Sequence, residues 1–165
     1  MSYLFENLRS YKEKNDRGVF ANLRCYLVPS KRQKAWPVLN HLNVAIDDTD
    51  SAFTAAWYAT YPEESLSGNF GTVCRCIGKS RNENKGSDDK LSPTERRFQQ
   101  LLASEKRELP ARITRFILAA KSAGIPVNYE QLRKDISRWG DRVKTEWASE
   151  FWIPGIPSDD GGENI

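Results

Sequence analysis

The sequence predicts an all-α protein, a two-lobed helical bundle of about six to nine helices. Three observations support this fold class. Apolar residues recur at steps of three and four along most of the chain, and this spacing places them on one face of a helix. Capping residues precede several of these apolar stripes. Residues that favour strands occur only in short patches.

The first part of the chain contains four helical patterns, each preceded by a candidate N-cap. These caps are Ser2, Asp16, Ser30 and, for the fourth helix, Asp50 or Thr49. The third helix has the weakest pattern, and its apolar residues are Trp36, Leu39 and Leu42. The fourth helix is rich in alanine and aromatic residues and is stopped by Pro62.

The middle of the chain is less regular. The stretch LSGNFGTVCRCIG, residues 66–78, fits either a short helix or an irregular turn, because its periodicity favours neither. Residues 79–91 are polar and rich in Gly, Ser and Asn, as is typical of an exposed loop or linker. We therefore predict an N-terminal lobe at 1–78 and a C-terminal lobe at 92–153, joined by residues 79–91.

The second lobe shows the strongest helix signals. Ser92, Pro93 and Glu95 form the pattern of an N-cap, a first helical residue and a completed capping box. Pro110 restarts a helix, for which Gly124 is placed as the C-terminal cap. Asn128 with Gln131 predicts a second capping box, opening the last helical stretch.

Residues 128–152 predict one long amphipathic helix with an aromatic-rich face. The apolar stripe follows steps of three and four and consists of Tyr129, Leu132, Ile136, Trp139, Val143, Trp147 and Phe151. The basic residues fall off this stripe; they are Arg133, Lys134, Arg138, Arg142 and Lys144. Acidic residues are interspersed with them, so the basic residues indicate either a solvated helix face or a contact with nucleic acid.

The net charge of +3 is unevenly distributed along the chain. Residues 154–165 contain three acids and no base, and we predict that this tail is disordered. Without these three acids the body carries about +6, which permits a polyanionic partner. The three cysteines do not suggest a disulfide framework, no apolar run approaches a membrane span, and no secretory signal is recognised. A cytoplasmic protein without membrane contact is predicted.

The sequence contains no recognisable active site. Common nucleotide-binding, hydrolase and metalloprotease motifs are absent, and a structural role is predicted for the single histidine, His41. The cysteines and His41 have poor spacing for zinc. We predict a non-enzymatic protein with no cofactor and no metal.

Five motifs occur in a fixed order along the chain. They are D-R-G-x-x-A-x-L-R at 16–24, T-E-R-R-F-x-x-L-L at 94–102, L-P-x-R-I at 109–113, G-I-P-V-N-Y-x-x-L at 124–132 and D-I-S-R-W-G-D-R-V-K-x-x-W-A-x-E-F at 135–151. As a set they resemble the small subunit of the type I-E CRISPR Cascade complex, the CasB family. The resemblance runs from about residue 16 to 152 and is most specific in the C-terminal half. Cys25 departs from it, because many members have a basic residue there.

This resemblance implies an all-α, non-catalytic subunit of a crRNA-guided antiviral complex. The implied partners are the backbone and large subunits, a second copy of the chain, and the target and displaced non-target DNA strands. Its basic surface would hold DNA backbone and stabilise the R-loop, whose formation is a nearly balanced exchange of base pairs. A purely structural assembly subunit without nucleic-acid contact is the alternative. A stand-alone helical regulator is a third, but no helix-turn-helix is recognised.

Eight basic residues are candidates for DNA contact. They are Arg24, Arg96, Arg97, Arg112, Arg115, Arg138, Arg142 and Lys144. The resemblance favours Arg24, Arg97 and Arg142 most. For each residue the competing interpretation is a salt bridge within the chain, such as Arg97 with Glu95 or Arg142 with Glu146.

Overall fold

A computed structural model describes residues 3–83 and 90–155. These residues form nine α-helices and three 3-10 helices, which confirms the predicted all-α class. The α-helices are α1 (Tyr3–Glu13), α2 (Arg17–Arg24), α3 (Trp36–His41), α4 (Thr49–Thr60), α5 (Phe70–Ser80), α6 (Pro93–Leu102), α7 (Leu109–Ala123), α8 (Tyr129–Ser137) and α9 (Asp141–Phe151). The 3-10 helices are η1 (Cys25–Leu27), η2 (Pro29–Ala35) and η3 (Lys106–Glu108).

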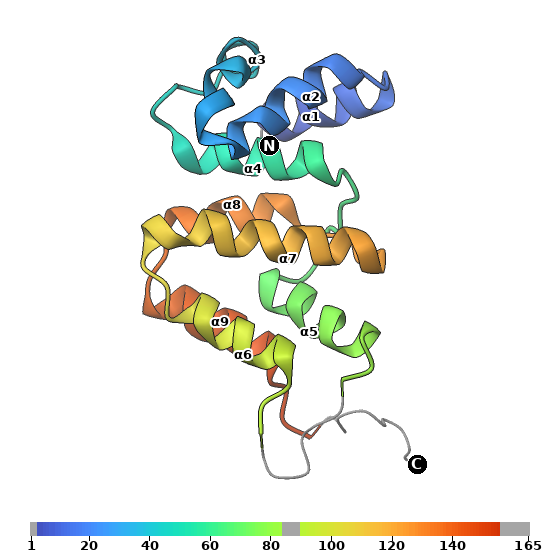
Figure 1. The fold of residues 1–165 in the computed structure, drawn as a ribbon, viewed down its shortest axis with the longest axis vertical. Coiled ribbons are helices and arrows are strands. Elements are labelled where there is room, and N and C mark those ends of the chain that lie inside the picture. Colours follow the sequence, from blue (N-terminus) through green and yellow to red (C-terminus); the bar gives the residue numbers. More distant parts are fainter. Residues whose placement is uncertain (1–2, 84–89, 156–165) are drawn as a thin grey trace.

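The helices stack in layers along the long axis of the molecule (Figure 1). Helices α1, α2 and α3 form one end: α1 and α2 lie on α4, and α3 packs on α2 and η2. Helix α4 packs in turn on α7 and α8. Helices α5, α6 and α9 form the other end, with α5 packed on both α7 and α9. No helix in the described part of the chain is long and apolar enough to cross a membrane.

Helix α4 lies at the centre of the fold because it is apolar around its whole circumference. From Ser51 to Ala59 every residue except Phe53 is buried. A helix that is hydrophobic on all sides is stable only when other helices surround it. Its four buried alanines allow neighbours to approach closely, while Trp57 and Tyr58 fill the space between layers. The Tyr129 hydroxyl donates a hydrogen bond to the Tyr61 carbonyl, at the C-terminal end of α4, and lies 3.3 Å from the Trp57 carbonyl oxygen.

Most of the predicted helix ends are confirmed. Asp16 caps α2, Ser92 and Glu95 form a capping box at α6, and Gly124 ends α7 with a left-handed φ of 73°. Asn128 caps α8, but the Gln131 side chain does not complete the box, because it donates to Asp135 at 2.8 Å. The predicted cap Ser2 lies outside the described residues.

Three predictions in the first four helices are wrong. Ser30 does not cap the third helix: it lies inside η2, and α3 begins after Ala35 without a side-chain cap. Helix α4 is capped by Asp48, whose carboxylate accepts from Ser51 N, rather than by Asp50 or Thr49. Three adjacent residues can all act as caps, so the sequence pattern did not distinguish among them. Trp36 was expected on the buried face of its helix, yet it is 41% exposed. The segment before it is a 3-10 helix, so the face that turns inward differs from that of an α-helix.

The undecided stretch at 66–78 contains helix α5. Asn69 and Thr72 form a capping box at its start, after Gly68 adopts a φ of 80°. Gly71 then allows α5 to approach α9 very closely, since a Cβ there would lie 2.0 Å from the Trp147 carbonyl oxygen. This approach brings Arg75 Nε to 2.9 Å from the Glu150 carbonyl, so each helix helps to fix the other.

The predicted single helix at 128–152 is wrong. It is broken at residues 138–140 into α8 and α9, which lie in different layers (Figure 1). Gly140 adopts an extended conformation at the break, yet Trp139 remains against Trp147, with ring centroids 5.0 Å apart. The aromatic residues therefore share one core across the turn, and their regular spacing concealed the break.

The connection at 79–91 is described at its two ends, residues 79–83 and 90–91. Helix α5 extends to Ser80, and Glu83 accepts hydrogen bonds from the backbone N–H and the hydroxyl of Thr94. Burial opposes ionisation of Glu83, but these hydrogen bonds outweigh it and lower its pKa. One buried core includes residues on both sides of the connection, so the division into lobes at 1–78 and 92–153 stays a prediction. Residues 156–165 of the acidic tail lie outside the described residues.

Candidate nucleic-acid interface

The eight predicted cations are spread over four helices and one turn. Arg24 ends α2, Arg96 and Arg97 lie on α6, Arg112 and Arg115 lie on α7, Arg138 lies in the turn after α8, and Arg142 and Lys144 lie on α9. All are exposed except Arg112 and Lys144, which are partly buried. Helices α6 and α7 pack together, so four of the cations lie on neighbouring helices. Helix α2, with Arg24, lies at the other end of the molecule (Figure 1).

Four of these cations make contacts within the chain. Arg24 donates to the Ala59 carbonyl at 3.2 Å, and Arg96 donates to the Leu91 carbonyl at 2.9 Å. Neither contact neutralises the guanidinium charge. Arg142 pairs with Glu146 at 3.3 Å, but its side chain is 86% exposed, and such pairs contribute little. The Lys144 ammonium lies 5.6 Å from the centre of the Trp139 ring, so it does not face away from the apolar stripe as predicted.

The competing salt bridges are formed in only one case. Within residues 3–83 and 90–155, Arg142 is the single candidate with an ion pair; Arg97 reaches neither Glu95 nor Glu105. Glu95 instead caps α6 and accepts from the Trp152 indole N–H at 3.0 Å. An unpaired, exposed guanidinium has no ion pair to break before it donates hydrogen bonds to a phosphate.

The prediction selected no cation between Arg24 and Arg96. The structure places Lys31, Lys34 and Lys79 on the surface in that interval. A signal for two of them was available in the sequence, because Lys31 and Lys34 lie in a long stretch without acidic residues.

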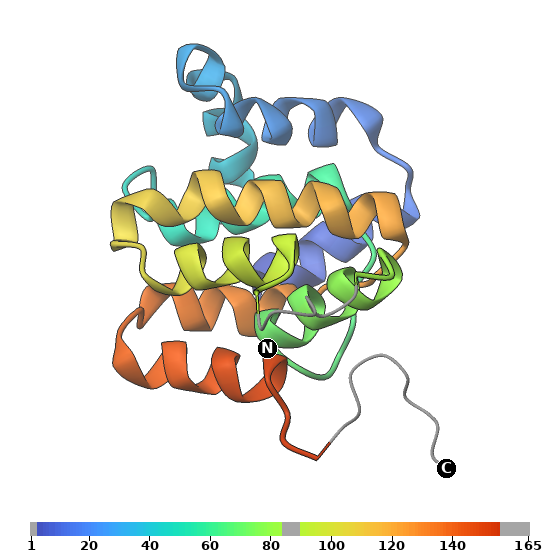
Figure 2. The same ribbon diagram turned by 60° about the horizontal axis from the view of Figure 1, so that its bottom comes forward.

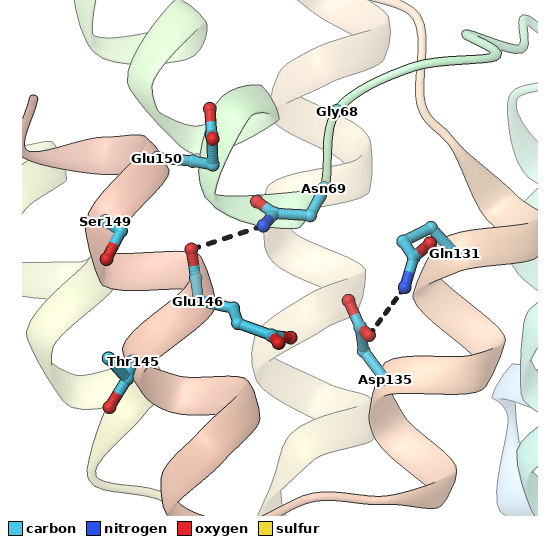
Figure 3. A pocket seen from close by; sticks show the side chains of 8 residues that line it. All are labelled: Gly68, Asn69, Gln131, Asp135, Thr145, Glu146, Ser149 and Glu150. Carbon is cyan, nitrogen blue, oxygen red and sulfur yellow. Dashed lines mark hydrogen bonds between the residues drawn. The ribbon is translucent and has the colours of Figure 1, made fainter.

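A polar hollow of about 430 Å³ lies between α5, α8 and α9 (Figure 3). Its lining consists of Gly68, Asn69, Gln131, Asp135, Thr145, Glu146, Ser149 and Glu150. Asn69 Nδ2 donates to the Glu146 carbonyl at 3.2 Å, and Gln131 donates to the Asp135 carboxylate, as Figure 3 shows. The other Asp135 oxygen accepts from the Trp147 indole N–H at 2.8 Å. With three carboxylates and no cation, this hollow repels phosphate, and its main hydrogen bonds hold helices together.

Candidate metal ligands and thiols are present in the described part of the chain. The described residues contain no group of three or more His, Cys, Asp or Glu side chains placed to hold a metal ion. The three cysteines are free thiols, and burial raises the pKa of Cys74 well above its usual value. His41 was expected to be structural but is exposed at the end of α3.

The sequence profile of the CRISPR-associated protein Cse2 family matches residues 8–152. The match covers most of the chain, including every described helix except the first five residues of α1. The chain belongs to the Cse2 family. A comparison with curated protein sequences gives no significant match.

Two crystal structures of Cse2-type proteins share the fold. One is a CRISPR-associated protein of the Cse2 family from Thermus thermophilus, with a TM-score of 0.70 and 18% identity. The other is described as CasB, also from Thermus thermophilus, with a TM-score of 0.66 and 19% identity. Each comparison covers 92% of this chain and 98% of the other. The helical arrangement is therefore that of Cse2 proteins, while the residue-level sites of this chain must be argued from its own side chains.

Proposed function

We propose that this Cse2 protein is a non-catalytic small subunit of a type I-E Cascade complex and that it holds DNA backbone to stabilise the R-loop. The observation that carries the proposal is the set of exposed cations on α2, α6, α7 and α9, of which only Arg142 is paired within the described residues. Backbone binding requires positive charge and reach but no base-reading geometry. Because exchanging one duplex for a hybrid is nearly balanced, modest backbone contacts shift the equilibrium.

The proposed partners follow from this role. Within the complex the subunit would contact the backbone and large subunits, a second copy of itself, the crRNA-containing assembly, and the target and non-target strands. The dispersed cations suit a long polyanion better than a small anion, because they lie on several helices rather than around one pocket.

The test compares two variants that each lose three positive charges. The first variant replaces Arg24, Arg97 and Arg142 with glutamine. The control variant replaces Lys12, Lys106 and Arg107. These three residues form ion pairs with Glu63, Asp50 and Glu105, respectively. Binding of the purified full chain to single- and double-stranded DNA is measured by fluorescence anisotropy across a salt series. If all three arginines contact phosphates, the slope of log K against log salt on duplex falls by about 2.7, while the control changes it little.

Two results contradict the arginine assignment. One is equal slopes for the arginine variant and the wild type. The other is an equal decrease of the slope in the arginine variant and the control, which would reflect the total charge of the protein rather than the positions of the arginines. Failure of the wild-type chain to bind DNA at low salt would favour the alternative, an assembly subunit whose basic surface contacts protein.

A further inference from the structure

The positive charge of this protein is concentrated in one segment. Residues 17–46 contain five basic residues and no Asp or Glu: Arg17, Arg24, Lys31, Arg32 and Lys34. The other 20 basic residues are outnumbered by the chain's 22 acidic ones, all of which lie outside this segment. The net charge of +3 therefore arises from the end of the molecule formed by α2, η1, η2 and α3, which is the upper end in Figure 1 and projects at the upper edge of Figure 2.

The 3-10 geometry of η2 divides this charge between two faces. Residues three apart in a 3-10 helix lie above one another. Arg32 and Ala35 face the core, where Ala35 is fully buried. Lys31 and Lys34 form an exposed row, and the adjacent row ends at Trp36. Lys31 and Lys34 thus share one exposed face of η2, and the exposed Trp36 follows directly, at the start of α3.

The inward face fixes this surface in place. The Arg32 guanidinium lies 4.8 Å from the centre of the Tyr26 ring and 5.3 Å from that of Phe53, and its Nε donates to the Tyr26 carbonyl at 2.8 Å. The Tyr26 and Phe53 rings contact each other edge-on, at 4.9 Å. Arg32 is therefore used for packing, which leaves Lys31 and Lys34 as the free cations of η2.

Trp36 is the unusual member of this surface. The indoles of Trp57 and Trp147 are fully buried and Trp139 is partly buried, each donating its N–H within the protein. Trp36 is 41% exposed, and no hydrogen bond from its indole is found within the described chain. An exposed aromatic ring beside lysines is the combination with which proteins bind single strands, because bases stack on the ring while cations meet phosphates.

We propose that Lys31, Lys34 and Trp36 form a binding site for single-stranded nucleic acid. The lysines contact successive phosphates, and the indole stacks on one unpaired base. Duplex DNA does not fit this site equally well, because its base faces are already stacked on each other. The inference rests on the proposed function and adds to it the strand type and a base-stacking residue outside the predicted set.

The test uses the full chain with a 20-nucleotide oligothymidine and a 20-base-pair duplex, measured by anisotropy. Trp36→Ala should weaken oligothymidine binding by about 5- to 150-fold, since stacking contributes roughly 1–3 kcal/mol per base. Trp36→Phe should retain most of the affinity. Trp36→Ala should leave the salt slope unchanged, whereas Lys31→Gln with Lys34→Gln should lower it by about 1.4.

Trp152→Ala is the matched control, because Trp152 is also exposed, at 37%, but directly follows α9, the helix at the opposite end of the molecule from η2. It should bind oligothymidine like the wild type. Circular dichroism and thermal unfolding establish that each variant is folded. An unchanged affinity of Trp36→Ala overturns the inference, and so does an equal weakening on duplex and single strand. Failure of the wild type to bind oligothymidine at low salt also overturns it.

The two proposals fail separately. If Trp36→Ala binds normally while the Arg24, Arg97 and Arg142 variant loses salt dependence on duplex, DNA-backbone binding stands and the stacking site is refuted. If only Trp36→Ala and the lysine variant weaken binding, the site stands and the arginine assignment is refuted.

Discussion

Replacing Gly71 with alanine tests the close packing of α5 on α9. The added Cβ would lie 2.0 Å from the Trp147 carbonyl oxygen and 2.8 Å from its carbonyl carbon. Both neighbours are backbone atoms, so no side-chain rotation relieves the contact. The helices must separate by roughly an ångström or more, and such overpacking costs about 1–3 kcal/mol.

Separation of the helices also weakens the bonds between them. Asn69 Nδ2 lies 3.2 Å from the Glu146 carbonyl, and Arg75 Nε lies 2.9 Å from the Glu150 carbonyl. Each such bond contributes about 0.5–1.5 kcal/mol. Against these losses, alanine in a helix gains up to about 1 kcal/mol over glycine. We expect Gly71→Ala to lower the free energy of unfolding by about 2 kcal/mol or more.

Gly78→Ala is the control in the same helix. Its Cβ would meet Thr94 Cγ2 at 3.5 Å, an ordinary van der Waals distance. The substitution should therefore be neutral or stabilise the protein by about 0.5–1 kcal/mol. Equilibrium urea unfolding measures both variants, with the dependence on urea concentration expected to stay unchanged. An unfolding midpoint for Gly71→Ala at or above that of the wild type would refute the described approach of α5 to α9.

Three further predictions concern buried polar groups. Asp135→Ala should lower the unfolding free energy by about 1–3 kcal/mol, because the buried Trp147 N–H loses its acceptor. Asp135→Asn keeps an acceptor oxygen and should be less destabilising. Equal urea midpoints for the two variants would contradict this reasoning. Burial raises the pKa of the Cys74 thiol in the folded chain. The contribution of the neutral buried thiol to stability is therefore complete below the pKa of the thiol in the unfolded chain, about 8.5, and is lost as the pH rises above that value. The wild type should therefore lose more stability than Cys74→Ala between about pH 8 and 10. Parallel plots of unfolding free energy against pH for the two proteins would contradict this. In the folded chain a thiol reagent should modify Cys25 and Cys76 faster than Cys74.

Much of the helical pattern was predictable because its signals are local. The caps at Asp16, Ser92 and Asn128 each depend on a side chain and a backbone N–H three residues away. Sequence spacing contains that information in full. The C-terminal cap at Gly124 is equally local, since it requires only a residue that tolerates positive φ.

The failures arise where distant contacts decide the structure. The break between α8 and α9 was hidden because Trp139 and Trp147 stay in one core on either side of the turn. Helix α5 was ambiguous because its glycine is explained only by α9, which lies more than 70 residues later. For the candidate interface, the sequence identified off-stripe cations, most of which are exposed. It did not indicate that Lys144 would cover Trp139 or that Trp36 would face solvent, because both depend on the local geometry of turns and 3-10 helices.

The hydrogen bonds that join the layers also set the order in which this chain can fold during synthesis. Arg9 in α1 forms hydrogen bonds with Glu64 and with Glu130 in α8, which lies 121 residues after Arg9. Helix α4 is completed by Tyr129, and α5 is held by α9. Helices α1, α4 and α5 thus each have a partner among the last two helices, unlike those of bundles in which only neighbouring helices pair. In a nascent chain that still lacks α8 and α9, α4 and α5 are covered only in part, so the core closes once the last helices have been made.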